Sequence, residues 1–143
     1  MTIAKPIPAP SVRTPLPRQK AAKSNFPMAI DGEAHRVLVV FRSPPTLMAL
    51  SSQDGRVAAK IETCGDADDV FVDRKRRRVY VSCGEGAVDV LEADEVGYRR
   101  LGRVPTVSGA RTSLFVPEMD RLFVAVRATS QEPAAIWVFR PAS

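Results

Sequence analysis

The chain has 143 residues and a formal net charge of +5, which is enough length for one domain with a hydrophobic core. Its two cysteines and single histidine are too few for a disulfide scaffold or a four-ligand zinc site. No apolar run reaches the roughly 18 residues of a membrane-spanning helix, so we predict no membrane span. Five of the 21 lysines and arginines fall in the first 25 residues, and the other 16 balance the 16 acids. The charge therefore does not mark the whole chain as a nucleic-acid binder.

The first 25 residues predict an arm without regular structure. They hold five bases, no acid, and the prolines Pro6, Pro8, Pro10, Pro15 and Pro17. Proline cannot donate ladder hydrogen bonds and favours an extended, solvated backbone. The arm either docks electrostatically on an anionic surface or has no role of its own. It lacks the apolar central region of a secretory signal, so the sequence leaves the cellular location open.

From residue 26 onward, short apolar segments alternate with turns and predict three blades, residues 26–63, 64–107 and 108–143. An Asp-Gly pair between two apolar runs, as at Asp54 and Gly55, favours a hairpin. No segment has helical periodicity over about ten residues, and the third blade lacks a fourth strand. The expected strands are 26–30, 36–42, 46–50 and 56–62 in the first blade, 69–73, 78–83, 86–92 and 97–104 in the second, and 112–116, 121–127 and 134–140 in the third.

One short segment occurs three times at a period of 42 to 44 residues, as 28–39, 70–81 and 114–124. A repeat of about this length, built of short strands and turns, is typical of propeller blades. We therefore predict an all-β fold, a partial β-propeller of about three four-stranded antiparallel blades with the last one incomplete. Alignment of the copies places two sets of residues at equivalent points, Arg36, Arg78 and Arg121, and Ile30, Val72 and Val116.

The segment Arg78-Val79-Tyr80-Val81-Ser82-Cys83 resembles the Tyr-Val-Thr-Asn motif of the YVTN-repeat propellers. Over residues 24 to 141 the chain is similar to the C-terminal part of the YncE-like seven-bladed members of that family. The resemblance is fairly specific for the fold and poorly specific for the activity. Family members carry a haem, accompany quinoproteins, bind DNA or hydrolyse lactones, and are often periplasmic.

In a propeller, the loops that enter the first strand of each blade and leave the second strand line one mouth of the channel. We predict that this mouth is the ligand-binding face and that it holds Asn25, Arg42, Asp66, Asp68, Asp69, Glu85, Arg111, Thr112 and Arg127.

Two chemistries are open to these mouth residues. The four acids would suit a hard divalent cation, or they serve as turn and capping carboxylates. The three arginines would clamp a carboxylate or phosphate, or they pair with aspartates of the adjacent loop. We predict no resident cofactor and no catalytic residue.

Cys64 lies in the loop that enters one strand, and Cys83 ends the strand expected to pair beside it. This placement allows a disulfide, which an oxidising compartment would favour, while two inert thiols are the alternative in the cytosol.

The densest run of charge is Arg74, Lys75, Arg76, Arg77 and Arg78, on the turn between the first two strands of the second blade. Such a run either contacts nucleic-acid phosphate or is a solvated turn. It lacks the interleaved aromatic residues that stack on bases.

The function we expect is a non-enzymatic binding or scaffold module of unknown ligand. The alternatives are a propeller hydrolase or redox-associated subunit that uses the mouth acids, and nucleic-acid binding through the 74–78 run. Open blade edges associate readily, so the expected partner is another protein or a second copy that completes the ring. Two copies would give about six blades, within the usual four to eight.

Overall fold

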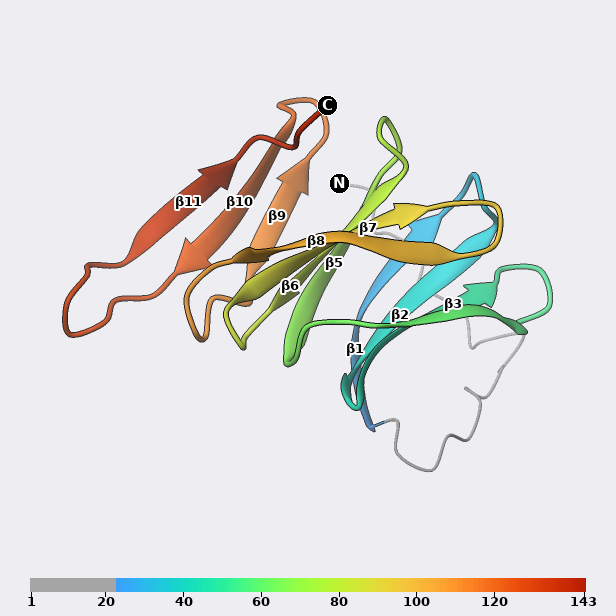
Figure 1. Ribbon diagram of the computed structural model, residues 1–143, viewed down its shortest axis with the longest axis horizontal. Helices are drawn as coiled ribbons and strands as arrows, with labels where there is room; N and C mark the ends of the chain where they lie inside the picture. The colour runs from blue at the N-terminus through green and yellow to red at the C-terminus, as the bar shows by residue number, and fades with distance from the viewer. Residues whose placement is uncertain (1–22) are drawn as a thin grey trace, which may run out of the picture.

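The computed structural model describes residues 23–143 and contains three antiparallel β-sheets arranged as successive blades (Figure 1). These residues include no helix, and so none that would be long and apolar enough to cross a membrane. Blade one has β1 (Lys23–Asp31), β2 (Arg36–Ser43), β3 (Pro45–Ser51) and β4 (Val57–Glu62). Blade two has β5 (Ala67–Asp73), β6 (Arg78–Cys83), β7 (Ala87–Ala93) and β8 (Tyr98–Pro105). Blade three has β9 (Ser113–Val116), β10 (Arg121–Val126) and β11 (Ala135–Phe139).

The predicted fold class is confirmed: the molecule is all-β, and its open sheets of four, four and three strands are consistent with a partial propeller. Within each sheet the strands follow chain order, and each pairs antiparallel with the next. The predicted arm lies outside the described residues, except that Lys23–Asn25 already belong to β1.

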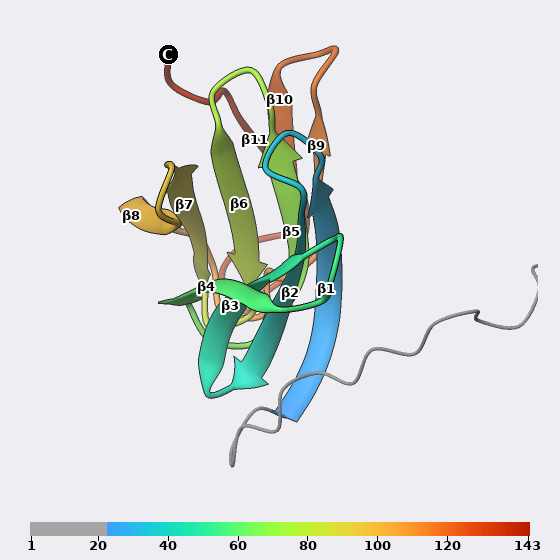
Figure 2. The same ribbon diagram turned by 90° about the vertical axis from the view of Figure 1, so that its right-hand side faces the viewer.

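The blades stack through their inner strands, because β5 contacts β1 on one side and β9 on the other. Figure 2, turned by 90° from Figure 1, shows β1, β5 and β9 following one another on one side of the molecule. We call the side of a blade that faces the preceding blade its leading face, and the side that faces the following blade its trailing face.

Strand alternation sends neighbouring residues to opposite faces, and blade two shows this most clearly. Val79 and Val81 on its leading face are buried in one cluster with Leu38 and Leu47 of blade one. Tyr80 on its trailing face is buried in a second cluster with residues of blade three. The leading face of blade one carries a third cluster, of Val39, Phe41, Met48 and Leu50.

The third copy of the repeat has a different register from the one that its sequence suggests. Leu122 pairs with Phe115, whereas Val79 in the second copy pairs with Val72. Phe115 is therefore the equivalent of Val72, and the predicted equivalence of Val116 with Ile30 and Val72 is wrong. Phe115 packs on Tyr80 of blade two, with ring centroids 5.2 Å apart and planes at 65°.

The repeated element that holds across all three copies is the turn into the second strand. The residue before each repeated arginine has a positive φ, 53° at His35, 54° at Arg77 and 54° at Asp120. A left-handed residue closes the turn in each blade, so the arginines mark the true alignment of the repeat.

Candidate functional site

At the mouth of the blade array, ion pairs to Asp66 connect the loops of the three blades. Arg42 at the end of β2 approaches one carboxylate oxygen of Asp66, with 3.3 Å between Nε and Oδ1. Arg111, in the loop before β9, approaches the other, with 2.6 Å between Nη2 and Oδ2. Asp66 of blade two therefore links blade one to blade three, and the three loops meet as predicted.

The other predicted acids are bound by neighbouring groups and do not converge. Asp68 accepts a 2.6 Å bond from Arg42 Nη2, and Asp69 accepts a 2.7 Å bond from the Ser113 N–H. Glu85 accepts a 2.6 Å bond from the Gly65 N–H and lies 3.7 Å from Arg103.

No three acids, histidines or cysteines within residues 23–143 lie close enough to hold a metal ion. The divalent-cation group predicted from Asp66, Asp68, Asp69 and Glu85 is thus not formed. The pairing of mouth acids with arginines, which was the alternative, is the arrangement that the structure has. Burial raises the pKa of Asp69, and the negative charge of Asp68 adds to the increase, while the Ser113 N–H opposes it.

The predicted arginine clamp is also not assembled. Arg42 and Arg111 both bind Asp66, whereas Arg127 is exposed and lies over Gly109, where an added Cβ would come within 2.7 Å of its Nε. Arg127 lines an open depression with Thr112, Ala135 and Ile136. Asn25 lies in β1, paired with Phe41 through the backbone.

Cys64 and Cys83 form a disulfide in the structure, with 5.8 Å between their Cα atoms. Both residues are buried, and Cys83 ends β6 opposite Ala67 of β5. The bond therefore ties the loop that enters blade two to the end of its second strand, next to Asp66.

A buried acid that sequence reasoning missed organises the middle of blade two. Asp89 is fully buried in β7 and accepts a 2.7 Å bond from the Cys64 N–H. It also accepts 2.6 and 3.1 Å bonds from Arg103 of β8, and Arg100 lies 3.4 Å away. An acid in the middle of the apolar run Ala87–Leu91 is the signal that would have identified it.

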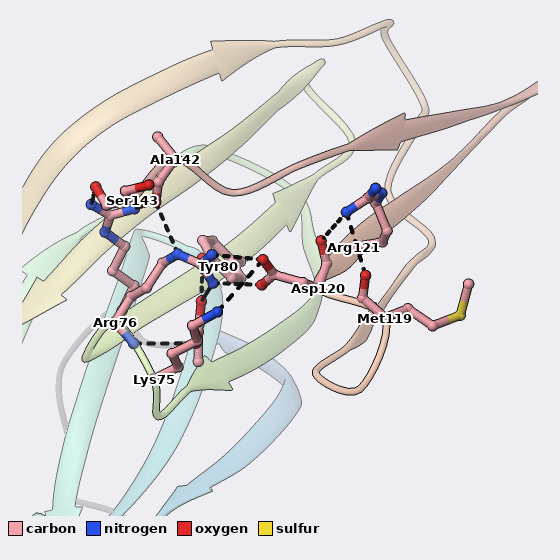
Figure 3. A network of polar contacts seen from close by, with 10 residues as sticks. Lys75, Arg76, Tyr80, Met119, Asp120, Arg121, Ala142 and Ser143 are labelled. Carbon is pink, nitrogen blue, oxygen red and sulfur yellow. Dashed lines mark hydrogen bonds and ion pairs between the residues drawn. The ribbon is translucent and has the colours of Figure 1, made fainter.

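The 74–78 run lies at the opposite end of the blades from the mouth, and two of its arginines, Arg76 and Arg78, donate hydrogen bonds to groups of the same chain. Figure 3 shows Lys75 and Arg76 beside Asp120. Arg76 donates bonds of 2.7 and 2.8 Å to Asp120 and one of 3.0 Å to Asp73. These two carboxylates raise the pKa of Arg76, Asp120 being the stronger. Arg78 donates to the carbonyl of Ala142 at 2.6 Å.

The same network includes further groups around Asp73 and Asp120. Lys75 lies 3.9 Å from Asp120, and the Tyr80 hydroxyl donates a 2.7 Å bond to Asp73. Burial, followed by the bond to Asp73, raises the pKa of Tyr80. The run therefore joins blade two to blade three and to the C-terminal residues.

A surface that the sequence did not single out is the trailing face of blade three. Leu114, Ile136 and Val138 lie on this face and are 55 to 61% exposed. By register, Ile136 is the equivalent of Leu47 in blade one and Val88 in blade two, both of which are buried. The trailing face of blade three is thus an inter-blade surface with no following blade among the described residues.

Comparison of the chain with protein-family models and with curated protein sequences found no match. The resemblance to YncE-like propellers and the function it implies therefore stay predictions. The arrangement of the blades and the contacts of the mouth are what the structure adds to them.

Proposed function

We propose that this protein is a non-enzymatic binding or scaffold module of the propeller type, of the YncE-like kind that its repeat resembles. The observation that carries the proposal is the exposed apolar trailing face of blade three. Soluble proteins rarely leave contiguous apolar surface exposed unless it contacts a partner.

The positions on this face support a protein partner shaped like a blade. Leu47 and Val88 show that this position packs against a following blade wherever one is present. At the other end of the array, Met28 and Ile30 of β1 are also exposed. A second copy would supply both missing surfaces, and two copies of three blades would give about six, a number that propellers adopt.

The alternatives have weaker support. A hydrolase or redox subunit would use the mouth acids, yet Asp66 and Asp68 are held by arginine. Nucleic-acid binding would use the 74–78 run, yet Arg76 and Arg78 donate to groups of the same chain.

Solution mass tests the proposal directly. We expect light scattering to give a mass above the 15.6 kDa of one chain, increasing with concentration. Replacing Ile136 and Val138 together by glutamate would place two charges on the trailing face, and charged groups resist burial without a partner. The double variant should therefore have the mass of one chain.

Met119→Glu is the matched control, because Met119 is also exposed and apolar but lies in the turn between β9 and β10. Its mass should equal that of the wild type. A wild-type chain of 15.6 kDa at every concentration would contradict completion of the ring by a second copy.

A further inference from the structure

Among residues 23–143, blade three has no outer strand of the kind that both other blades have. In blades one and two the fourth position is occupied by β4 and β8, and these two strands contact each other across the blade boundary. Sheet three ends at β11, so β11 is an edge strand next to the position where β8 would have its counterpart. The position itself specifies an extended chain, since an extended chain fills it twice in this molecule.

The backbone of β11 presents hydrogen-bonding groups at that edge. The Ala125 N–H donates to the Thr112 carbonyl on the β9 side. In an antiparallel ladder, alternate residues bond to opposite neighbours, so Val124 and its partner Trp137 bond to each other. The N–H and C=O groups of Ile136 and Val138 therefore point outward, away from the sheet.

Between blades one and two, an aromatic residue of the fourth strand fills the boundary. Tyr98 begins β8 and packs on the cluster that joins these blades. The guanidinium of Arg36 lies over its ring, 5.5 Å from the centroid, and its hydroxyl donates a 3.2 Å bond to Asp31. Burial raises the pKa of Tyr98 to about 12.

At the equivalent place between blades two and three there is a cavity of about 250 Å³. An apolar cavity of roughly 150 Å³ already accepts benzene, so this one is large enough for a phenol ring. Pro141 is the register equivalent of Ala93, the residue that pairs with Tyr98. The lining includes Tyr80, Val88, Val90, Leu122 and Phe139, together with Arg78.

Arg78 is the repeat equivalent of Arg36, so it stands where a cation would lie over the missing ring. Its two terminal nitrogens donate to the carbonyls of Ala142 and Ser143, but its Nε is buried and has no hydrogen-bond partner within the described residues. Arginine stacks on aromatic faces, so the cavity offers both the space and the charge for an aromatic side chain.

We propose that an extended segment of another polypeptide adds to β11 as the fourth strand of blade three and inserts an aromatic side chain into this cavity against Arg78. Backbone bonds to Ile136 and Val138 would give the segment its register, and the cavity would select the aromatic residue. The proposal rests on the binding role inferred above, but it concerns the edge of blade three and not its trailing face.

A labelled synthetic peptide, Thr-Tyr-Thr-Val-Thr-Val-Thr, is the probe, and fluorescence anisotropy measures its dissociation constant for the full chain. Val138→Pro removes one outward N–H, and proline is tolerated at an edge position whose N–H faces solvent. Val138→Ala is the matched control, because it shortens the same side chain and keeps the N–H. We expect the proline variant to bind about tenfold more weakly than the alanine variant.

The peptide provides a second measurement that does not depend on folding of a variant. Replacing its tyrosine by alanine should weaken binding by about tenfold or more. N-methylation of its threonines, which face Ile136 and Val138 when the tyrosine is opposite Pro141, should have a similar effect. Equal binding of the proline and alanine variants, or of the tyrosine and alanine peptides, would overturn the proposal, as would absence of binding at millimolar peptide. A chain that binds the peptide and keeps a mass of 15.6 kDa would contradict self-association but not strand addition. A chain that forms an oligomer and does not bind the peptide would contradict strand addition but not self-association.

Discussion

Asp66 and Arg111 form an ion pair of 2.6 Å across the boundary between blades two and three. The pair needs a glycine at position 84, because an added Cβ there would overlap the Asp66 carboxylate and stand 2.8 Å from Arg111 Nε. We expect Gly84→Ala to lower the free energy of unfolding by about 1–3 kcal/mol, as overpacking does in tightly packed regions.

Urea unfolding followed by circular dichroism measures this difference. Gly102→Ala is the control, since no atom lies within 4 Å of a Cβ added there. Equal midpoints for the two alanine variants would show that the pair tolerates displacement and that Asp66 does not depend on Gly84.

Arg76 is the residue of the 74–78 run on which the fold depends most. It bonds to Asp73 and to Asp120, so Arg76→Ala leaves both carboxylates without their main cation. We expect a lower melting temperature for this variant in differential scanning fluorimetry. Arg74→Ala should have the melting temperature of the wild type, because Arg74 has no ion pair among the described residues. A melting temperature that falls equally in both variants would contradict a specific role for Arg76.

Nucleic-acid binding can be tested at the residues of the 74–78 run other than Arg76 and Arg78, whose side chains bond to the protein. A variant with serine at Arg74, Lys75 and Arg77 keeps the bonds of Arg76 and Arg78. If the run contacts phosphate, wild-type affinity for DNA falls steeply with salt and the triple variant has a smaller salt slope. We expect neither, because the bonds of Arg76 and Arg78 indicate that the run joins blades.

The first two strands of each blade were predictable because the repeated segment contains them in all three copies. The strand register of the third copy was not predictable. Its segment is one residue shorter, and the predicted alignment of Val116 with Ile30 and Val72 placed Phe115 one position away from its true equivalent, although Arg121 was aligned correctly. Only the pairing of Phe115 with Leu122 shows which face the ring occupies. In a β-strand, a shift of one residue moves every side chain to the opposite face of the sheet. An alignment error of one residue therefore assigns the whole strand to the wrong face.

The meeting of the mouth loops was predictable from propeller topology, but the partners of each charge were not. Only Ala67 separates Asp66 from Asp68 in the sequence, yet Arg42 pairs with both and Arg111 with Asp66 alone. Those choices depend on side-chain positions across two blade boundaries, which residue type and spacing do not specify. Asp89 was missed for a related reason, because its partners come from the entry loop and from β8.

The Cys64–Cys83 disulfide should contribute measurably to stability. It closes a loop with a sequence separation of 19, for which the loss of chain entropy in the unfolded state corresponds to about 3 kcal/mol. A double variant with alanine at both positions should have a free energy of unfolding lower by that amount, measured by urea unfolding. Reduced wild type should have the same free energy of unfolding as the double variant. Identical unfolding of oxidised and reduced wild type would contradict this expectation.

Asp69 should make stability depend on pH in the direction opposite to an ordinary paired acid. Its pKa is raised in the folded state, so the unfolded chain releases this proton first as pH increases. Stability is then lost as the pH rises from the ordinary aspartate value of about 4 through the folded pKa, and it stays lower above that point. Asp69→Asn removes this loss while its amide oxygen still accepts the Ser113 N–H.

We therefore expect Asp69→Asn to gain stability relative to wild type between about pH 3 and pH 7, measured by urea unfolding at each pH. Asp94→Asn is the control of opposite sign, because bonds from the Gly97 and Val96 N–H groups lower the pKa of Asp94. Its carboxylate contributes stability above the unfolded pKa that is lost as pH falls, so that variant should lose stability relative to wild type as pH rises. A constant difference between Asp69→Asn and wild type across the range would mean that Asp69 titrates alike in the folded and unfolded chains.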